Sequence, residues 1–130
     1  MSSRADAQDG VIASQLAILM PALLALLMLA VQFGLWAHAT QLARAAADEA
    51  TYTAALPDST LDAGRTAAAG LLAQAGHLTN IRIDLATDPA TGMVIATVTG
   101  VAPQVVPGFR WSVAASAAAT PERFIPQGQR

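Results

Sequence analysis

The chain has 130 residues and a formal net charge of −2; 54% of its residues are hydrophobic and 12% are charged. A soluble domain usually carries about a quarter charged residues, so this composition indicates a membrane segment. The seven basic residues are all arginines spread along the chain, which excludes the dense basic patch of a nucleic-acid-binding protein. The lack of cysteine excludes disulfides, thiolate zinc sites and a cysteine nucleophile.

A long apolar segment follows a short polar start. No charged residue lies between Asp9 and Arg44, and Gln32 is the one strongly polar residue from Leu16 to Ala37. As a helix rising about 1.5 Å per residue, these 22 residues reach about 33 Å, and a bilayer core is about 30 Å thick. The pattern predicts a single N-terminal transmembrane helix over about residues 16–37.

The residues at the two ends of this segment indicate whether it is cleaved and which way it is oriented in the membrane. Ala37–Ala39 has the A-x-A form of a signal-peptide cleavage site, so a small secreted module released after Ala39 is an alternative. Signal h-regions are usually about 7–15 residues and follow a positive start, whereas this segment is longer and Arg4 is outweighed by two aspartates. The short tail favours a cytoplasmic N-terminus and an extracytoplasmic head, although Arg4 and Arg44 nearly balance the charge rule.

Several residues within the segment suggest specific roles. Pro21 removes a backbone hydrogen bond and is expected to kink the helix. Trp36 and His38 lie at its far end, where amphipathic rings suit the lipid–water interface. Ala30 and Gly34 are small residues spaced i, i+4, which favours close helix packing in lipid, although alanine is common throughout this chain.

Gln15 and Gln32 are the polar residues near the two ends of the segment. Each has an amide that can hydrogen-bond across a helix pair, and each also suits a simple position near an interface. The sequence leaves both interpretations open.

The helical pattern continues through an alanine-rich stretch to Leu56, where Pro57 ends it. Ser59 is the expected N-cap of a second helix, with Asp62 at the capping-box offset. This second helix is expected to end at Ala75, with Gly76 as its C-terminal cap. Its apolar face is formed by Leu61, Ala68, Leu71, Leu72 and Ala75.

The period then changes to that of β-strands. Strands are predicted over residues 80–86, 93–101 and 110–117, the first two joined by a turn and the last two by a proline-containing loop. The predicted fold is α+β, with two helices covering one face of a three-stranded antiparallel sheet. The chain then divides into a cytoplasmic leader (1–10), a long helix (11–56) and an extracytoplasmic head (57–130).

No residue pattern indicates catalysis. His38 and His77 are far apart in the sequence and are interpreted as an interfacial ring and a loop residue. The carboxylate pairs Asp48–Glu49 and Asp58/Asp62 are interpreted as solvated side chains. No nucleophile elbow, phosphate-binding loop or metal-ligand spacing is present, so neither an enzyme nor a cofactor is expected.

The polar leader ending in Gly10, the apolar helix with Pro21 and the run VQFGLWAHATQLARAAADEA (residues 31–50) together resemble TadE-like proteins. These are pseudopilin-type components of tight-adherence (Flp-type) pilus systems. The resemblance is strongest over residues 9–51. The second helix, the hairpin and the ending PERF (Pro121–Phe124) resemble actinobacterial members of the family.

The resemblance implies that a prepilin peptidase cleaves after Gly10, which makes Val11 the first mature residue. It also implies a glutamate at the fifth mature position, where this chain has Gln15. Glutamine cannot pair as an anion with the amino terminus of a neighbouring subunit, although it can accept a hydrogen bond. A permanent, uncut anchor is therefore the alternative to cleavage.

The function that the resemblance implies is that of a minor pseudopilin or pilus-assembly component in the cell membrane. Its partners would be lipid, other pilin-like subunits and the membrane proteins of a tight-adherence system, and it would enter a pilus or pseudopilus. The open face of the sheet and loop 102–109 are candidate contact surfaces of the head. The alternatives are an uncleaved single-pass scaffold and the secreted module released after Ala39.

Overall fold

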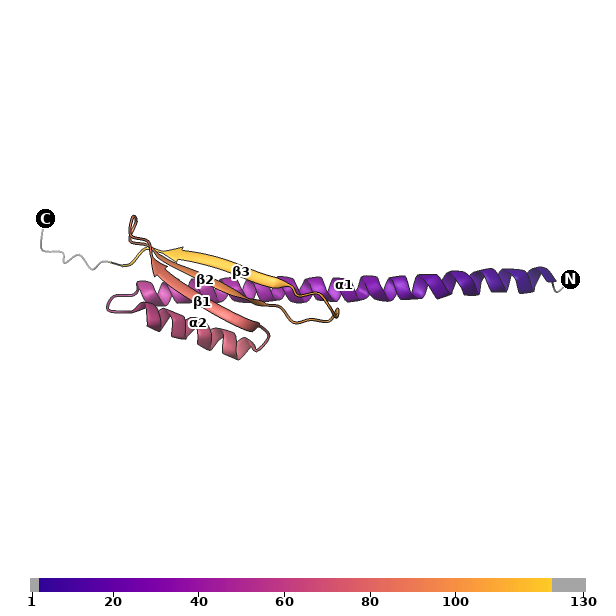
Figure 1. Ribbon diagram of the computed structural model, residues 1–130, viewed down its shortest axis with the longest axis horizontal. Helices are drawn as coiled ribbons and strands as arrows, with labels where there is room; N and C mark the ends of the chain where they lie inside the picture. Colours follow the sequence, from indigo (N-terminus) through magenta and orange to yellow (C-terminus); the bar gives the residue numbers. More distant parts are fainter. Residues whose placement is uncertain (1–2, 123–130) are drawn as a thin grey trace, which may run out of the picture.

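The computed structural model describes the backbone of residues 3–122 and the side chains from Gly10 to Glu122 (Figure 1). The start of the predicted leader and the end of the predicted head, with Arg123 and Phe124, lie outside the described residues. The elements in chain order are α1 (Ser3–Ala55), α2 (Leu61–Ala75), β1 (Thr79–Thr87), β2 (Val94–Val101) and β3 (Ser112–Ala119). This order confirms the predicted α+β fold.

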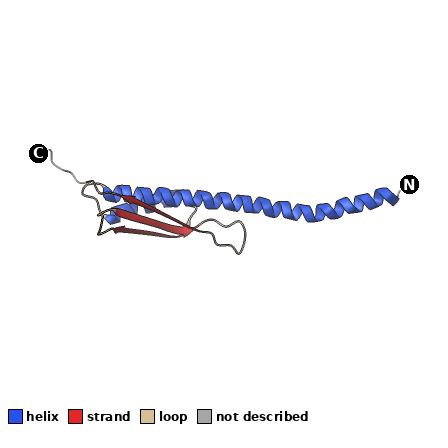
Figure 2. Cartoon of the chain, turned by 90° about the horizontal axis from the view of Figure 1, so that it is seen from above, coloured by secondary structure: helices blue, strands red, loops and turns tan. Residues whose placement is uncertain are grey.

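Helix α1 is longer at its start than the sequence pattern predicted. It begins at Ser3 instead of Val11 and continues unbroken through Gly10 and Pro21 to Ala55. The leader residues extend the helix because alanine, glutamine and aspartate are compatible with its first turns, where acidic residues favour the helix dipole. Figure 2 shows a gentle bend in the N-terminal part of α1.

The N-cap of α2 lies one residue after the predicted position. Thr60, not Ser59, is the N-cap, and its hydroxyl accepts a hydrogen bond from the Ala63 N–H at 3.1 Å. Ser59 is instead used to close the end of α1, since its N–H donates to the Leu56 carbonyl at 3.2 Å. Gly76 is confirmed as the C-terminal cap, with a left-handed φ of 65°.

The sheet has the order β1-β2-β3 and both pairings are antiparallel. Leu85 of β1 lies opposite Ala96 of β2, and Val98 of β2 lies opposite Ala115 of β3. Strand β3 begins at Ser112, two residues later than predicted, because the chain before it still belongs to the loop that leaves β2. The burial along β2 alternates strictly, which places one face of the sheet in the core and leaves the other in solvent.

Both helices pack on the same face of the sheet, as Figures 1 and 2 show from two directions. Helix α1 lies along β2 and β3, and α2 lies beside α1 and contacts β1. The core between these layers is built largely from alanine. Its buried members are Ala43, Ala46, Ala47, Ala50, Ala68, Leu72, Leu85, Val94, Ala96 and Val98. Such small side chains allow the helices and the sheet to approach closely.

Gly64 shows how close the two helices come. A Cβ at this position would press on the carbonyl oxygen of Ala50 and lie 2.9 Å from the Cβ of Ala54 and 3.0 Å from a methyl of Leu85. The backbone of α2 therefore rests almost directly on α1 here. Only glycine fits this crossing without a shift of one helix.

Candidate functional site

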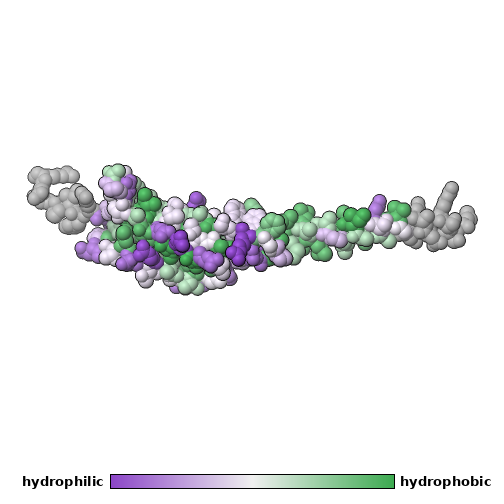
Figure 3. Space-filling model, viewed as in Figure 1, coloured by the Kyte–Doolittle hydropathy of each residue, from purple (hydrophilic) through white to green (hydrophobic). Residues whose placement is uncertain are grey.

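The N-terminal half of α1 is not covered by the rest of the chain. Every described residue from Gly10 to Val31 is exposed, although nearly all of them are apolar. Figure 3 shows this part as a hydrophobic rod that projects from a head of mixed polarity. The helix is long and apolar enough to cross a membrane. Its most apolar segment has a mean hydropathy of 2.4, and 6% of that segment is buried within the chain. The rest of the described chain therefore does not bury this segment as a core helix.

The residues at the predicted processing site lie on this uncovered helix. Gly10 has open space around it, since a Cβ built there would meet nothing within 4 Å. Val11 is 56% exposed and Gln15 is also exposed, beside Ile18, Leu19 and Ala22 on the helix surface. No part of the head from Leu61 to Glu122 covers them, so a peptidase or a neighbouring subunit has access to all three.

The predicted packing pair is likewise uncovered. Ala30 and Gly34 are exposed, and a Cβ built at Gly34 would meet nothing within 4 Å. A second helix therefore has room to approach this side of α1. Packing at Ala30–Gly34 stays a prediction, because the structure holds one chain.

Trp36, predicted to lie at the membrane interface, also contacts the head of the protein. It is half-buried, and its indole lies between Phe33, at 5.7 Å between ring centroids, and Trp111, at 6.2 Å. Its Nε1–H donates to the Ser112 carbonyl at 3.3 Å. Trp36 therefore joins α1 to the start of β3.

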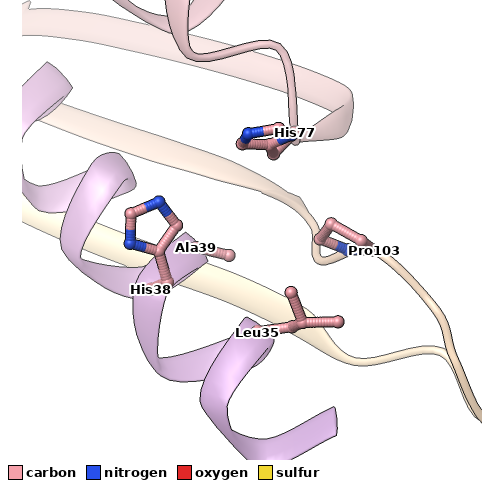
Figure 4. Close-up of a pocket in the computed structure, with 5 residues that line it drawn as sticks. All are labelled: Leu35, His38, Ala39, His77 and Pro103. Atoms are coloured by element: carbon pink, nitrogen blue, oxygen red, sulfur yellow. The ribbon is translucent and has the colours of Figure 1, made fainter. Parts of the chain in front are cut away.

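His38 and His77, which the sequence pattern treats separately, are neighbours in the structure. Their ring centroids are 6.4 Å apart across a cavity of about 220 Å³ (Figure 4). The other lining residues, Leu35, Ala39 and Pro103, carry no polar side chain. Among the residues that the structure describes, no group of three or more His, Cys, Asp or Glu side chains could hold a metal ion.

Gln32 is the functional residue whose role the sequence left open. Its side chain is fully buried beneath the loop between β2 and β3. Its amide oxygen accepts hydrogen bonds from the Val105 N–H at 2.7 Å and the Val106 N–H at 3.3 Å, and its Nε2 donates to the Pro103 carbonyl at 3.0 Å. The available signal was that an isolated polar residue in an apolar helix tends to have a specific partner.

The charged groups of the head have ordinary surface roles. Asp62 pairs with Arg65 on the exposed side of α2 instead of closing a capping box. Asp88 lies in the β1–β2 turn, where the Ala90 N–H and then the Thr91 hydroxyl donate to its carboxylate. These two hydrogen bonds hold the pKa of Asp88 below its ordinary value of 3.8.

Comparison with known proteins gives one match. The sequence profile of the family described as TadE-like protein matches residues 10–51, which begin at Gly10 and end near the end of α1. No curated protein and no solved structure matches the chain. The match and the apolar N-terminal helix fit a component of a tight-adherence pilus system. The match confirms the resemblance to TadE-like proteins over residues 10–51.

Proposed function

We propose that this protein is a membrane-anchored TadE-like subunit of a tight-adherence pilus or secretion system, with a structural and not a catalytic role. The observation that carries the proposal is the uncovered apolar run within the TadE-like segment. The 21 residues from Val11 to Val31 reach about 32 Å at about 1.5 Å each, close to the roughly 30 Å of a bilayer core.

This run differs from the predicted span of residues 16–37. The head covers α1 from Gln32 onward, and a side chain bound to the head cannot also face the middle of a bilayer. We therefore place the span at about residues 11–31, with the N-terminus in the cytoplasm and the head outside. The end of the head that carries the β2–β3 loop then lies next to the membrane.

The proposed assembly role uses the same surface. Cleavage after Gly10 would leave Val11 as the first residue at the cytoplasmic end of the span, next to Gln15. Lateral packing at Ala30–Gly34 would then bring similar helices together, in lipid or in a filament, because both surroundings are apolar. The proposed partners are lipid, pilin-like subunits, the membrane proteins of the assembly system and a prepilin peptidase.

An uncut single-pass scaffold is the second candidate. Two observations favour it: Gln15 replaces the expected glutamate, and α1 is continuous through Gly10, so a peptidase must unwind helix to reach the bond. A secreted module released after Ala39 fits the structure poorly. Ala39 is 1% exposed in the middle of α1, and cleavage there would remove the contacts of Gln32 and Trp36 with the head.

The deciding experiment is the intact mass and N-terminal sequence of the protein from its native membranes. A start at Val11 supports the processed subunit. A start at Met1 or Ser2 contradicts processing and favours the scaffold, and a start at Thr40 contradicts the anchor altogether. Gly10→Val is expected to block cleavage, whereas Gly34→Val, the same change beyond the site, is expected to leave it intact.

A further inference from the structure

The loop between β2 and β3 (residues 102–111, hereafter the β2–β3 loop) projects beyond the sheet toward the N-terminal half of α1 (Figures 1 and 2). It meets α1 where the uncovered run ends. Leu29 and Gln32 of α1 and Val106, Phe109 and Trp111 of the loop line a small cavity of about 60 Å³ between them. The loop therefore packs against the helix at the expected level of the membrane surface.

Gln32 holds the loop in this place. Three hydrogen bonds join its amide to the backbone of Pro103, Val105 and Val106, and the side chain has no exposed surface. A buried amide with both ends paired stabilises one arrangement of the loop, since any shift would leave polar atoms unpaired.

Part of the polar backbone at the loop's tip is paired within the chain. Pro103 and Pro107 have no N–H, and the N–H groups of Val105 and Val106 are bound by Gln32. The Gln104 side chain donates to the Phe109 carbonyl. These hydrogen bonds lower the cost of bringing the loop to the lipid–water interface, where water still reaches the remaining polar groups of the backbone.

The side chains of the tip are apolar, and those of Val105 and Phe109 are exposed. Phe109 is 63% exposed and Val105 is 39% exposed, and Phe33, one residue after Gln32 on α1, is 58% exposed. The loop has one charged residue, Arg110, which is exposed, and no acidic residue. Aromatic rings with an adjacent arginine are typical of the lipid–water interface, where the cation reaches the phosphates.

We propose that the β2–β3 loop is a second membrane contact, with its tip (Val105–Phe109) inserted into the outer lipid interface beside α1. Gln32 is the positioning residue that holds the tip at this depth. The inference rests on the proposed membrane span, because a lipid surface at this level requires α1 to cross the bilayer over about residues 11–31. Two attachments in place of one would restrict the tilt of the head on its helix.

Spin labels at single cysteines test the proposal in the full-length protein, which has no native cysteine. The protein is reconstituted in vesicles of phosphatidylcholine with a minor fraction of phosphatidylglycerol. Labels are placed at Leu24 in the span, at Phe109 in the tip and at Ala114 on the solvent face of β3. Collisions with oxygen, which concentrates in lipid, are compared with collisions with a water-soluble nickel chelate.

The expected result is that labels at Leu24 and Phe109 collide more with oxygen, and that a label at Ala114 collides more with nickel. A Phe109 label as open to nickel as the Ala114 label, with Leu24 still protected, overturns the loop contact and leaves the anchor intact. A water-exposed Leu24 label overturns the anchor and the loop contact together. Protection of Phe109 that disappears as lipid is added in excess indicates a second copy of the chain and overturns the lipid contact.

The role of Gln32 is tested with Gln32→Leu combined with the Phe109 label. This change keeps the side-chain size but removes the hydrogen bonds to the loop, so nickel collisions at Phe109 are expected to rise several-fold. Gln41→Leu, an exposed position on the same helix, is the matched control and should not alter them. Unchanged collisions in Gln32→Leu, with thermal unfolding showing an intact head, would overturn the positioning role.

Discussion

The two halves of α1 differ in which side chains are buried. The uncovered half comprises residues 10–31, and the covered half comprises residues 32–55, which lie along the head. In the uncovered half the side chains are large and exposed; Leu24, for example, is 59% exposed. In the covered half the side chains on the packed face are mostly alanines, and Ala46 is completely buried. A soluble protein would bury the large apolar side chains and expose the alanines, because the free energy gained on burial grows with apolar surface area. The difference indicates that the first half meets an apolar environment outside this chain, whereas the second half packs against the head.

The size of the exposed apolar set makes this interpretation strong. Burying one Leu, Ile or Val side chain contributes roughly 1.5–3 kcal/mol, so a row of them left in water would be a severe liability. The set is Val11, Ile12, Leu16, Ile18, Leu19, Met20, Leu23, Leu24, Leu26, Leu27, Met28, Leu29 and Val31. A membrane or a bundle of similar helices must cover it.

The largest predicted effect comes from charging the uncovered half. Leu23 and Leu26 are 59% and 64% exposed, and replacing each with arginine should cost about 3 kcal/mol of insertion free energy near the middle of a bilayer. We expect the double variant to leave the membrane fraction on carbonate extraction. The pair Gln41→Arg and Ala45→Arg adds the same charge to exposed positions of the covered half and should remain membrane-bound. Equal extraction of both variants would contradict the division of α1.

The covered half can be weakened at the helix crossing. Gly64→Ala places a methyl group against the Ala50 carbonyl, and overpacking of this kind costs about 1–3 kcal/mol. We expect a clear drop in the thermal unfolding midpoint of the head, measured by circular dichroism, with membrane association unchanged.

Gly70 provides the matched control for this change. It lies in the same helix, and a Cβ there would meet nothing within 4 Å. Gly70→Ala should therefore leave the head as stable or stabilise it by up to about 1 kcal/mol, because alanine is the better helix former. If the two alanine variants behave alike, α2 does not rest on α1 as described.

A smaller effect distinguishes the observed cap of α2 from the predicted one. Thr60→Ala removes the hydroxyl that accepts from the Ala63 N–H and should destabilise the head by about 1 kcal/mol. Ser59→Ala leaves that hydrogen bond in place and should have little effect in the same unfolding measurement. A larger loss of stability in Ser59→Ala than in Thr60→Ala would instead identify Ser59 as the cap.

The smallest effect concerns the β1–β2 turn, far from the membrane. Because hydrogen bonds lower the pKa of Asp88, its carboxylate stabilises the folded head fully above the ordinary value of 3.8, and this contribution is lost as the pH falls through the lowered pKa. We expect Asp88→Asn to flatten the acid side of the stability curve slightly, measured as unfolding midpoint against pH. Asp84→Asn, on the exposed face of β1, is the charge-matched control.

The sequence predicted the elements whose signal is local. The apolar run, the change of period at residue 80 and the stop at Pro57 identify two helices and three strands, and Gly76 caps α2 as expected. Ser59 and Thr60 are adjacent and chemically alike as caps, so the local sequence does not distinguish them; in the structure a left-handed residue, Asp58 with a φ of 61°, precedes both. Pro57 and Asp58 indicate a turn here, but not which of the two following residues caps α2.

The contacts that locate the membrane boundary could not be predicted in this way. Gln32 and Val105 are 73 residues apart, and so distant a hydrogen bond leaves no periodic trace in the sequence. The same holds for His38 and His77, whose proximity depends on the antiparallel return of α2 along α1. Composition indicates a candidate span, whereas the tertiary packing of the head shows where the uncovered run ends.

The most direct test of the membrane span is a cysteine scan of α1 with a membrane-impermeant maleimide, on the full-length protein in vesicles. Cysteines over residues 11–31 should resist labelling. Cysteines at exposed positions of the covered half, such as Gln41 and Arg44, should react. Ile12 is the most informative position, because it is protected in a span of 11–31 but lies outside one of 16–37. Rapid labelling at Leu23 or Leu24 would contradict the account, because the uncovered half would then lie in water.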